Sequence, residues 1–415
     1  MSRLGRFEMT TGHIVKYNKL MRTLLAPLLL PFAVAAWVSA CSAGALSPEA
    51  GSPQAGSPQA EPLEPGPPEP GPAPPAEPGA TTGSVAAVPP AAPATTVLAT
   101  PAGTHPGPQS CPAEMKLVEG DYCTKVEQKC AVQWYAPQNK KKVCEQFIAP
   151  TRCTGSRVKK RFCIDTYAWP NQRGTRPEVM NTFYQAQVKC AALGKRMCTE
   201  SEWTFACEGP EMKPFPHGYI RDPRKCNGDH KWDNPKMSRV AKRDPKELAR
   251  LWRGVPSGSQ PECVSDFGVH DLPANNDEVV SGESRKAKFS SVNTGGPWYS
   301  GVRNQCRPKI YSHEEGFYYY FLGFRCCAEP DGAASDPRTP KQIRDHWTFS
   351  RIERLAQFTV AEVKDKLEQK KAGTCACEPK QILCKTMCGT LLGPNAVDGS
   401  DSTRVPHRSR KKISK

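Results

Sequence analysis

The chain has 415 residues, among them 19 cysteines and 42 prolines, and its formal net charge at pH 7 is +16. So many cysteines argue against a reducing cytosol, where thiols stay reduced and disulfides are rare. The basic residues are scattered rather than gathered in one region, and an exported protein rarely meets nucleic acid, so we expect no nucleic-acid partner. We favour a solvated basic surface over one that contacts anionic lipid, lipopolysaccharide or acidic glycans.

Residues 1–41 predict an export signal. From Met21 the chain reads MRTLLAPLLLPFAVAAWVSAC, which is a basic start, an apolar run and small residues before Cys41. This order is typical of a secretory signal peptide, and VSAC (38–41) resembles a bacterial lipobox, which is cleaved before a lipidated cysteine. An ordinary signal peptide is one alternative. An uncleaved anchor helix is another, but two prolines and an apolar run of under ~18 residues disfavour it.

We therefore predict lipidation at Cys41 and attachment to the membrane through that lipid. Ser42 follows the cysteine and favours the outer membrane under the usual bacterial sorting rule, with the domain in the periplasm or at the cell surface. Residues 42–110 are rich in Pro, Ala, Gly, Ser and Glu and include the tandem repeat GSPQAGSPQA. Such a segment cannot bury apolar surface and stays extended, so we expect a disordered spacer between the anchor and a folded domain.

The folded domain is expected to begin at Cys111. Fourteen cysteines lie between Cys111 and Cys327, whereas none lies between Cys41 and Cys111. Aromatic residues become frequent here, and short strand-like runs alternate with Gly and Pro. This pattern predicts a disulfide-rich α+β domain with irregular loops over residues 111–330.

Local signals place three elements in this domain. RFCIDTYAW (161–169) alternates in the manner of a strand. Thr182 can cap a helix that runs to about Leu193, where the glycine that follows suits a helix end. TESE (199–202) is a capping box, which opens a second helix through about Cys207.

Residues 331–389 are predicted to form a helical extension. TPKQ (339–342) is a capping signal with proline at the first helical position, and helical spacing relates Ile343, Trp347, Ile352 and Leu355. A second capping box, TVAE (359–362), opens a helix that ends near Gly373.

Four cysteines then follow, namely Cys375, Cys377, Cys384 and Cys388. Four thiolates could hold zinc, but a single residue separates the first two, and the compartment is oxidising. We therefore favour two disulfides over a metal site. Residues 390–415 are predicted to be a basic, disordered tail.

Several segments of the middle region, taken in order, resemble a known family. They are FCIDTYAWPN, GKRMCTESEWTFACEG, PFPHGY, CVSDFGVHDLPANNDEVV, GGPWYSGVRNQCRP and LGFRCC. In this order and spacing they are similar to the formylglycine-generating enzyme, or sulfatase-modifying factor, family, over about residues 111–328. The resemblance implies that family's fold, which is similar to C-type lectins, with little regular secondary structure, small sheets and a few helices.

The resemblance also raises a question about catalysis. Active members oxidise a peptide cysteine to formylglycine with oxygen, and they bind copper(I) through two cysteines just after the GG-x-W strand. Copper(I) is a soft ion that prefers thiolates. Here the residues after the glycine pair are Pro297, Trp298, Tyr299, Ser300 and Gly301. None is a strong copper(I) ligand, so we expect no copper and no catalytic residue.

The resemblance assigns other residues to structural roles. It implies that Cys306 pairs with Cys207 and that Cys326 pairs with Cys190, while the pairing of the remaining cysteines stays open. It also implies a calcium site in the loop before the glycine pair, where Asp271, Asn276 and Glu278 supply side-chain oxygens and Ala274 a carbonyl. A polar loop without metal is the alternative, because alanine and valine replace the family's usual glycine and tryptophan.

These observations favour a non-catalytic module that binds a peptide, a glycan or another envelope protein. Active relatives bind peptide beside the glycine pair, so we expect a binding groove there formed by Trp298, Tyr299, Arg303 and Arg307. Aromatic and arginine side chains are common interface anchors. One alternative is a metal-dependent oxidoreductase of the same family that acts on a peptide or small molecule. The other is a purely structural envelope protein whose spacer and basic tail bridge lipid and wall.

Overall fold

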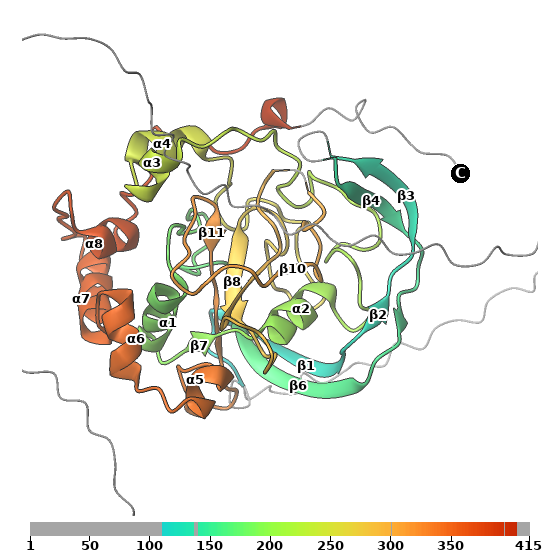
Figure 1. The fold of residues 1–415 in the computed structure, drawn as a ribbon, viewed down its shortest axis with the longest axis horizontal. Helices are drawn as coiled ribbons and strands as arrows, with labels where there is room; N and C mark the ends of the chain where they lie inside the picture. The colour runs from blue at the N-terminus through green and yellow to red at the C-terminus, as the bar shows by residue number, and fades with distance from the viewer. Residues whose placement is uncertain (1–109, 137–139, 300, 394, 405–415) are drawn as a thin grey trace, which may run out of the picture. The chain divides into compact units, whose positions relative to one another are not determined.

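A computed structural model describes residues 110–136, 140–299, 301–393 and 395–404 (Figure 1). The predictions of a signal peptide, of lipidation at Cys41 and of a spacer over 42–110 lie outside the described residues. The α+β prediction for the region from Cys111 is confirmed: short helices and small sheets are joined by long loops. No described helix has the length and apolar character that crossing a membrane requires.

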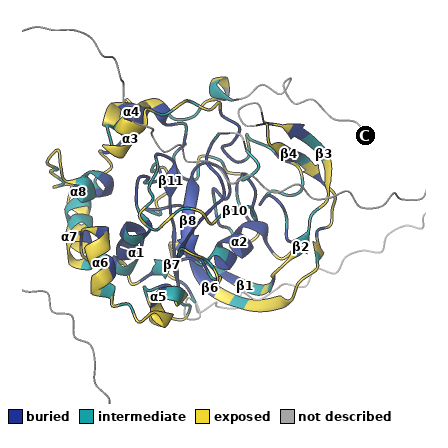
Figure 2. Ribbon diagram, viewed as in Figure 1, coloured by how far each residue is buried: buried dark blue, intermediate teal, exposed yellow. Residues whose placement is uncertain are grey.

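Two four-stranded sheets form the centre of the fold. The first has the order β1-β6-β12-β7 and is antiparallel throughout; its strands are β1 (Met115–Cys123), β6 (Arg157–Asp165), β12 (Cys326–Ala328) and β7 (Arg196–Met197). The second has the order β10-β9-β8-β11, with β8 and β11 parallel; its strands are β10 (Lys309–Ile310), β9 (Ser291–Thr294), β8 (Asp277–Ser281) and β11 (Leu322–Gly323). Figure 2 shows that β8 is buried along its whole length.

Two two-stranded sheets complete the set of described strands. They join β2 (Val126–Glu127) to β5 (Arg152–Cys153) and β3 (Cys130–Tyr135) to β4 (Lys142–Phe147). The predicted strand over 161–169 is shifted, because β6 ends at Asp165 and the chain then turns so that Trp169 stacks on Phe324. The strand begins earlier than predicted, since the exposed residues 157–159 and the partly buried Lys160 pair with the end of β1.

The two helices predicted for the domain are present. Helix α1 (Phe183–Ala192) is capped by Thr182, whose side chain accepts a hydrogen bond from Gln185 N. Helix α2 (Glu200–Glu208) has the predicted capping box, in which the Thr199 side chain and Glu202 bond each other's backbone N–H. These bonds satisfy N–H groups that have no partner inside a helix. Two short helices follow, α3 (Met237–Ala241) and α4 (Pro245–Leu251).

The C-terminal extension packs on α1. It contains α5 (Pro340–Arg344), α6 (Phe349–Ala356), α7 (Val360–Lys371) and α8 (Ile382–Met387), and α6 and α7 lie against α1 (Figure 1). Ile352 and Val363 are fully buried in the core around α1. Ile343 and Leu355, which share the predicted helical spacing, are 41% and 43% exposed. They do not belong to one helix, because α5 ends at Arg344 and α6 begins at Phe349.

The prediction of disorder after residue 389 is wrong for the described part of the tail, which extends to Arg404. Leu391, Leu392 and Ala396 are buried in a cluster that also contains Trp252 and Trp298. Asp398 forms an ion pair of 2.8 Å with Arg176. The tail is mostly polar, so its composition predicted disorder. Its few apolar residues nevertheless pack against the hydrophobic cluster around Trp252 and Trp298. A short 3₁₀ turn, Asp401–Thr403, lies near the end of the described chain.

Candidate functional site

The chain bends at Gly295 and Gly296, directly after β9. The family resemblance places the copper-binding cysteine pair just after this bend. Gly295 and Gly296 have φ values of +86° and +68°, a conformation that glycine adopts at little cost. A side chain at Gly295 would also meet the ring of Trp203 at 2.9 Å, and one at Gly296 would meet the backbone of Arg303 at 2.9 Å. Both positions therefore require glycine, and the backbone motif is retained without the cysteines.

Every cysteine from Cys111 to Cys388 is in a disulfide. The two bridges that the resemblance implied, Cys190–Cys326 and Cys207–Cys306, are present. The structure adds seven more: Cys111–Cys163, Cys123–Cys153, Cys130–Cys144, Cys198–Cys327, Cys226–Cys263, Cys375–Cys388 and Cys377–Cys384. The last two are the tail pair that we favoured over zinc. The described residues thus contain no free thiol.

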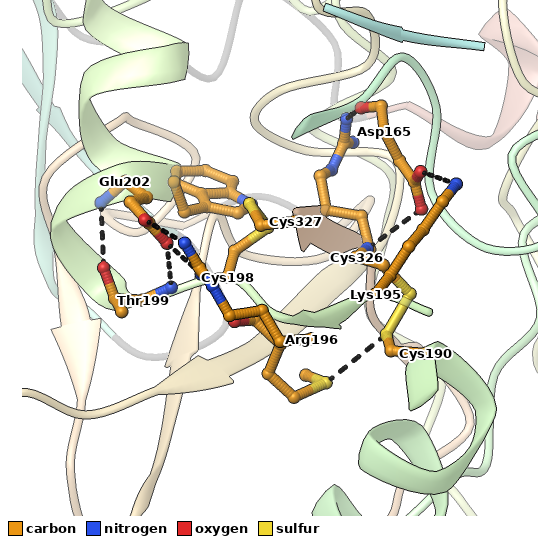
Figure 3. The surroundings of a disulfide bond; sticks show 12 residues. Asp165, Cys190, Lys195, Arg196, Cys198, Thr199, Glu202, Cys326 and Cys327 are labelled. Atoms are coloured by element: carbon orange, nitrogen blue, oxygen red, sulfur yellow. Dashed lines mark hydrogen bonds and ion pairs between the residues drawn. A yellow bond between two sulfur atoms is a disulfide. The ribbon is translucent and has the colours of Figure 1, made fainter. Parts of the chain in front are cut away.

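Two adjacent cysteines of β12 form bridges: Cys326 joins the sheet to Cys190 in α1, and Cys327 joins it to Cys198, which lies between β7 and α2 (Figure 3). Around these bridges, Lys195 Nζ lies 2.7 Å from Asp165 Oδ1, while Asp165 Oδ2 accepts a hydrogen bond from Cys326 N. Arg196 forms two hydrogen bonds of 2.8 Å with Glu202, the residue that completes the α2 capping box. Lys195, Arg196 and Glu202 of this segment therefore have structural partners within the domain.

The structure brings Tyr299 and Arg303 together through a side-chain hydrogen bond, but it does not place all four predicted groove residues in one groove. Trp298 is 2% exposed and packs edge-on against Trp252, so its predicted place in a groove is wrong. Tyr299 is half-buried between Trp232 and Phe321. The sequence could not show this, because the residues that cover Trp298 come from distant segments, including the C-terminal tail.

The two arginines of the predicted groove have separate partners. Arg303 Nη1 lies 2.8 Å from a carboxylate oxygen of Asp277, which is buried in β8. Arg307 donates two hydrogen bonds of 2.6 Å to Glu208 and one of 2.7 Å to the carbonyl of Cys123. Arg307 lines a cleft of about 450 Å³.

The predicted calcium loop fits a cation only in part. Asp271 Oδ1 and Asn276 Oδ1 are buried and have no hydrogen-bond partner among the described residues, so a cation could satisfy both. Burial raises the pKa of Asp271 to about 6. Ala274 adopts φ +75°, so it takes the conformation of the glycine it replaces. Glu278 does not fit the predicted role, because Arg325 and the Trp203 N–H already occupy both of its oxygens at 2.8 Å.

The cleft that contains Arg307 lies between β1, β6, α2 and β10 and has a volume of about 450 Å³. Charged and aromatic side chains dominate its walls, namely Tyr122, Lys160, Glu200, Arg307, Lys309 and Tyr311. Sequence reasoning missed this site because its residues come from five separate segments. The one available signal was the alternation of Arg307, Lys309 and Tyr311, since residues two apart share a face of a strand.

Lys309 is the most unusual group in this cleft. Its ammonium donates to Thr294 Oγ1 at 2.7 Å and to the carbonyl of Cys306 at 3.2 Å. It also lies 5.1 Å from the centre of the Trp203 ring. Burial lowers the pKa of Lys309 to about 7, an effect that the nearby carboxylates of Glu200 and Glu208 only partly offset. The amine is therefore poised between its charged and neutral forms near neutral pH.

Comparison with known proteins identifies the class. The chain matches the family described as sulfatase-modifying factor enzyme 1-like domain over residues 122–330, and it belongs to that family. A comparison with curated proteins gave no significant match.

Solved structures similar to this chain include three proteins. One is CarF, with 12% identity and a TM-score of 0.35; the alignment covers 53% of this chain and 99% of the CarF chain. Another is variable protein 1 of Treponema denticola, with 12% identity and a TM-score of 0.33, which covers 52% and 95%. PvdO from Pseudomonas aeruginosa has 15% identity and a TM-score of 0.32, with coverage of 52% and 94%.

Proposed function

We propose that this chain is an exported lipoprotein whose sulfatase-modifying-factor domain binds a ligand and does not oxidise a peptide cysteine through copper. The observation that carries this proposal is the pairing of all cysteines from Cys111 to Cys388 in nine disulfides. Copper(I) prefers thiolate ligands, and the described residues contain no free thiol. The disulfides also support an oxidising compartment, in keeping with a periplasmic or cell-surface location.

The cleft beside Arg307 is the best-supported binding site. Its volume of about 450 Å³ lies within the range of roughly 300–1,000 Å³ that is usual for ligand sites. It combines two tyrosines with charged groups of both signs, which suits a polar ligand such as a peptide or glycan, free or carried by an envelope protein. The membrane contact is assigned to lipid on Cys41, and no nucleic-acid partner is proposed.

An oxidation assay tests the catalytic half of the proposal. The full chain, purified from membranes, would be incubated with copper(I), oxygen and peptides that contain one cysteine, and formylglycine would be measured by mass spectrometry. We expect no peptide oxidation above that of copper alone. Turnover with copper(I), or with iron(II) supplied in its place, would contradict the proposal and favour the alternative, a metal-dependent oxidoreductase.

An obstruction variant tests the binding half. Val158 is 44% exposed and lines the cleft, so Val158→Trp should narrow the cleft without disturbing the core. The exposed Lys364 of α7 lies outside the cleft, and Lys364→Trp is the matched control. Peptide and glycan arrays should show ligands that the wild type and the control bind and Val158→Trp does not. Equal binding by all three chains would place the ligand site elsewhere.

We propose calcium as a structural ion held by Asp271, Asn276 and nearby carbonyls, which include that of Ala274, without Glu278. Calcium at 100 times its dissociation constant would stabilise the fold by about 2.7 kcal/mol. Calcium should therefore raise the melting temperature of the wild type, and a chelator should reverse the shift. Asp271→Asn should abolish it, while the surface change Glu368→Gln should not. An equal shift in all three chains, or none, would contradict this site.

A further inference from the structure

Two charges of opposite sign in the cleft lack an ion-pair partner. Most of the charges there are neutralised at contact distance: Arg307 by Glu208 and Lys160 by Glu283, the latter at 3.4 Å. Lys309 and Glu200 differ, because neither forms an ion pair with any described residue. Both line the same cleft.

Lys309 is held by neutral groups on its inner side. Thr294 Oγ1 and the Cys306 carbonyl account for two of the three ammonium protons, which leaves one proton for a ligand, and the Trp203 ring centre lies 5.1 Å from the ammonium. An ammonium group that is removed from water and forms no ion pair at contact distance is costly. A ligand carboxylate in the cleft would supply the missing counter-charge.

Glu200 is the complementary group. Its Oε2 accepts a hydrogen bond of 2.7 Å from the Tyr311 hydroxyl, and its Oε1 accepts one of 2.9 Å from Glu283 N. Two ionised oxygens offer about four acceptor sites, so capacity for a cationic donor remains. Among the charged groups that act on Lys309, Glu200 has the largest effect, although the two do not touch.

We propose that this cleft binds a zwitterion, an amino acid or dipeptide whose carboxylate pairs with Lys309 and whose ammonium pairs with Glu200. This inference rests on the proposed binding function and specifies its ligand class. Lys309 and Glu200 line the same cleft. A zwitterion carries one negative group that can pair with Lys309 and one positive group that can pair with Glu200. The half-buried ring of Tyr122 and the half-exposed ring of Tyr311 supply apolar surface for the body of the ligand.

The test uses three probes that differ in one charge at a time. Alanyl-alanine carries both charges, N-acetyl-alanyl-alanine lacks the ammonium, and alanyl-alanine amide lacks the carboxylate; free alanine tests the ligand length. Binding to the full chain would be measured by calorimetry at pH 6.5, where Lys309 is largely charged. A charge-assisted hydrogen bond contributes about 1.5–3 kcal/mol, so each neutralised probe should bind at least about tenfold more weakly.

Two variants then assign each charge to its residue. Lys309→Met should remove the preference for the free carboxylate while keeping the preference for the ammonium. In Glu200→Gln the amide oxygen can accept from Glu283 N, and the amide N–H can donate to the Tyr311 hydroxyl. This variant should remove the preference for the ammonium while keeping the preference for the free carboxylate. Lys364→Met and Glu368→Gln, on the exposed side of α7, are matched controls that should bind all probes as the wild type does.

Three results would overturn the inference. They are equal binding of all probes, preferences unchanged in Lys309→Met and Glu200→Gln, and no binding of any probe to a folded chain. In the last case the charges of Lys309 and Glu200 act on each other electrostatically, without direct contact, and pair with no ligand. Each of these results leaves the copper assay and the array comparison intact, so failure of the zwitterion proposal is distinct from failure of the proposed function.

Discussion

The buried pair of Arg325 and Glu278 connects the GFRC motif to β8. Both side chains are at most 1% exposed, and the guanidinium donates two hydrogen bonds to the carboxylate. Removing one partner leaves a buried charge alone, which costs about 3–5 kcal/mol. Arg325→Leu should therefore lower the free energy of unfolding by this amount in urea titration.

An exposed pair provides the control for this change. Arg338 and Asp336 lie 2.7 Å apart, with side chains 33% and 40% exposed. Exposed pairs contribute about 0–1 kcal/mol, so Arg338→Leu should change stability little. Similar losses in both variants would show that the buried pair has no special role.

Lys309 should make stability depend on pH. Its pKa is about 7 in the fold and near 10.5 in the unfolded chain, so between these values the unfolded state binds more protons. The free energy of unfolding should therefore rise as pH increases from 7 to about 10.5. This contribution is absent below pH 7, where both states are protonated at Lys309. Lys309→Met should flatten the rise, whereas an unchanged profile would show that the fold leaves this amine near its ordinary pKa.

The residue-level comparison with the sequence shows where local reasoning succeeds. Thr182 and Thr199 were predicted as helix caps because capping depends on residues three apart. Trp298 was misplaced because its burial depends on Trp252 and on tail residues almost 100 positions away. The pairing of Glu278 with Arg325 was equally hidden, since it depends on the register between distant strands.

At the scale of elements, helices were easier to predict than strands. α1, α2, α5 and α7 have caps that the sequence displays, whereas β7, β10, β11 and β12 have only two or three residues. Strands this short have no readable alternation, and their pairing is fixed by tertiary contacts and by disulfides. The family resemblance therefore supplied the fold, while composition supplied only the α+β class.

Disulfides that close long segments should matter most to these short elements. Cys207–Cys306 joins α2 to the end of the glycine loop across 99 positions, whereas Cys377–Cys384 spans 7. Loop-closure entropy predicts that the longer bridge contributes on the order of 2 kcal/mol more. Replacing each pair by alanines and measuring urea unfolding should reproduce this difference. A larger loss from the tail bridge would contradict the entropic account.

At the scale of the whole molecule, the extension is part of the domain. Helices α6 and α7 cover α1, and the tail to Arg404 covers the cluster around Trp298. The surface where the sequence suggested a groove is thus filled by the chain itself. The charged cleft lies at a separate location, between β1, β6, α2 and β10.

The central claim is that the scaffold of this family persists here without reactive thiols, and intact mass of the full chain after alkylation tests it most directly. The account predicts no adduct before reduction and eighteen after it, one for each cysteine from Cys111 to Cys388. Two adducts before reduction, at cysteines that also bind copper(I), would contradict it and reveal an oxidase.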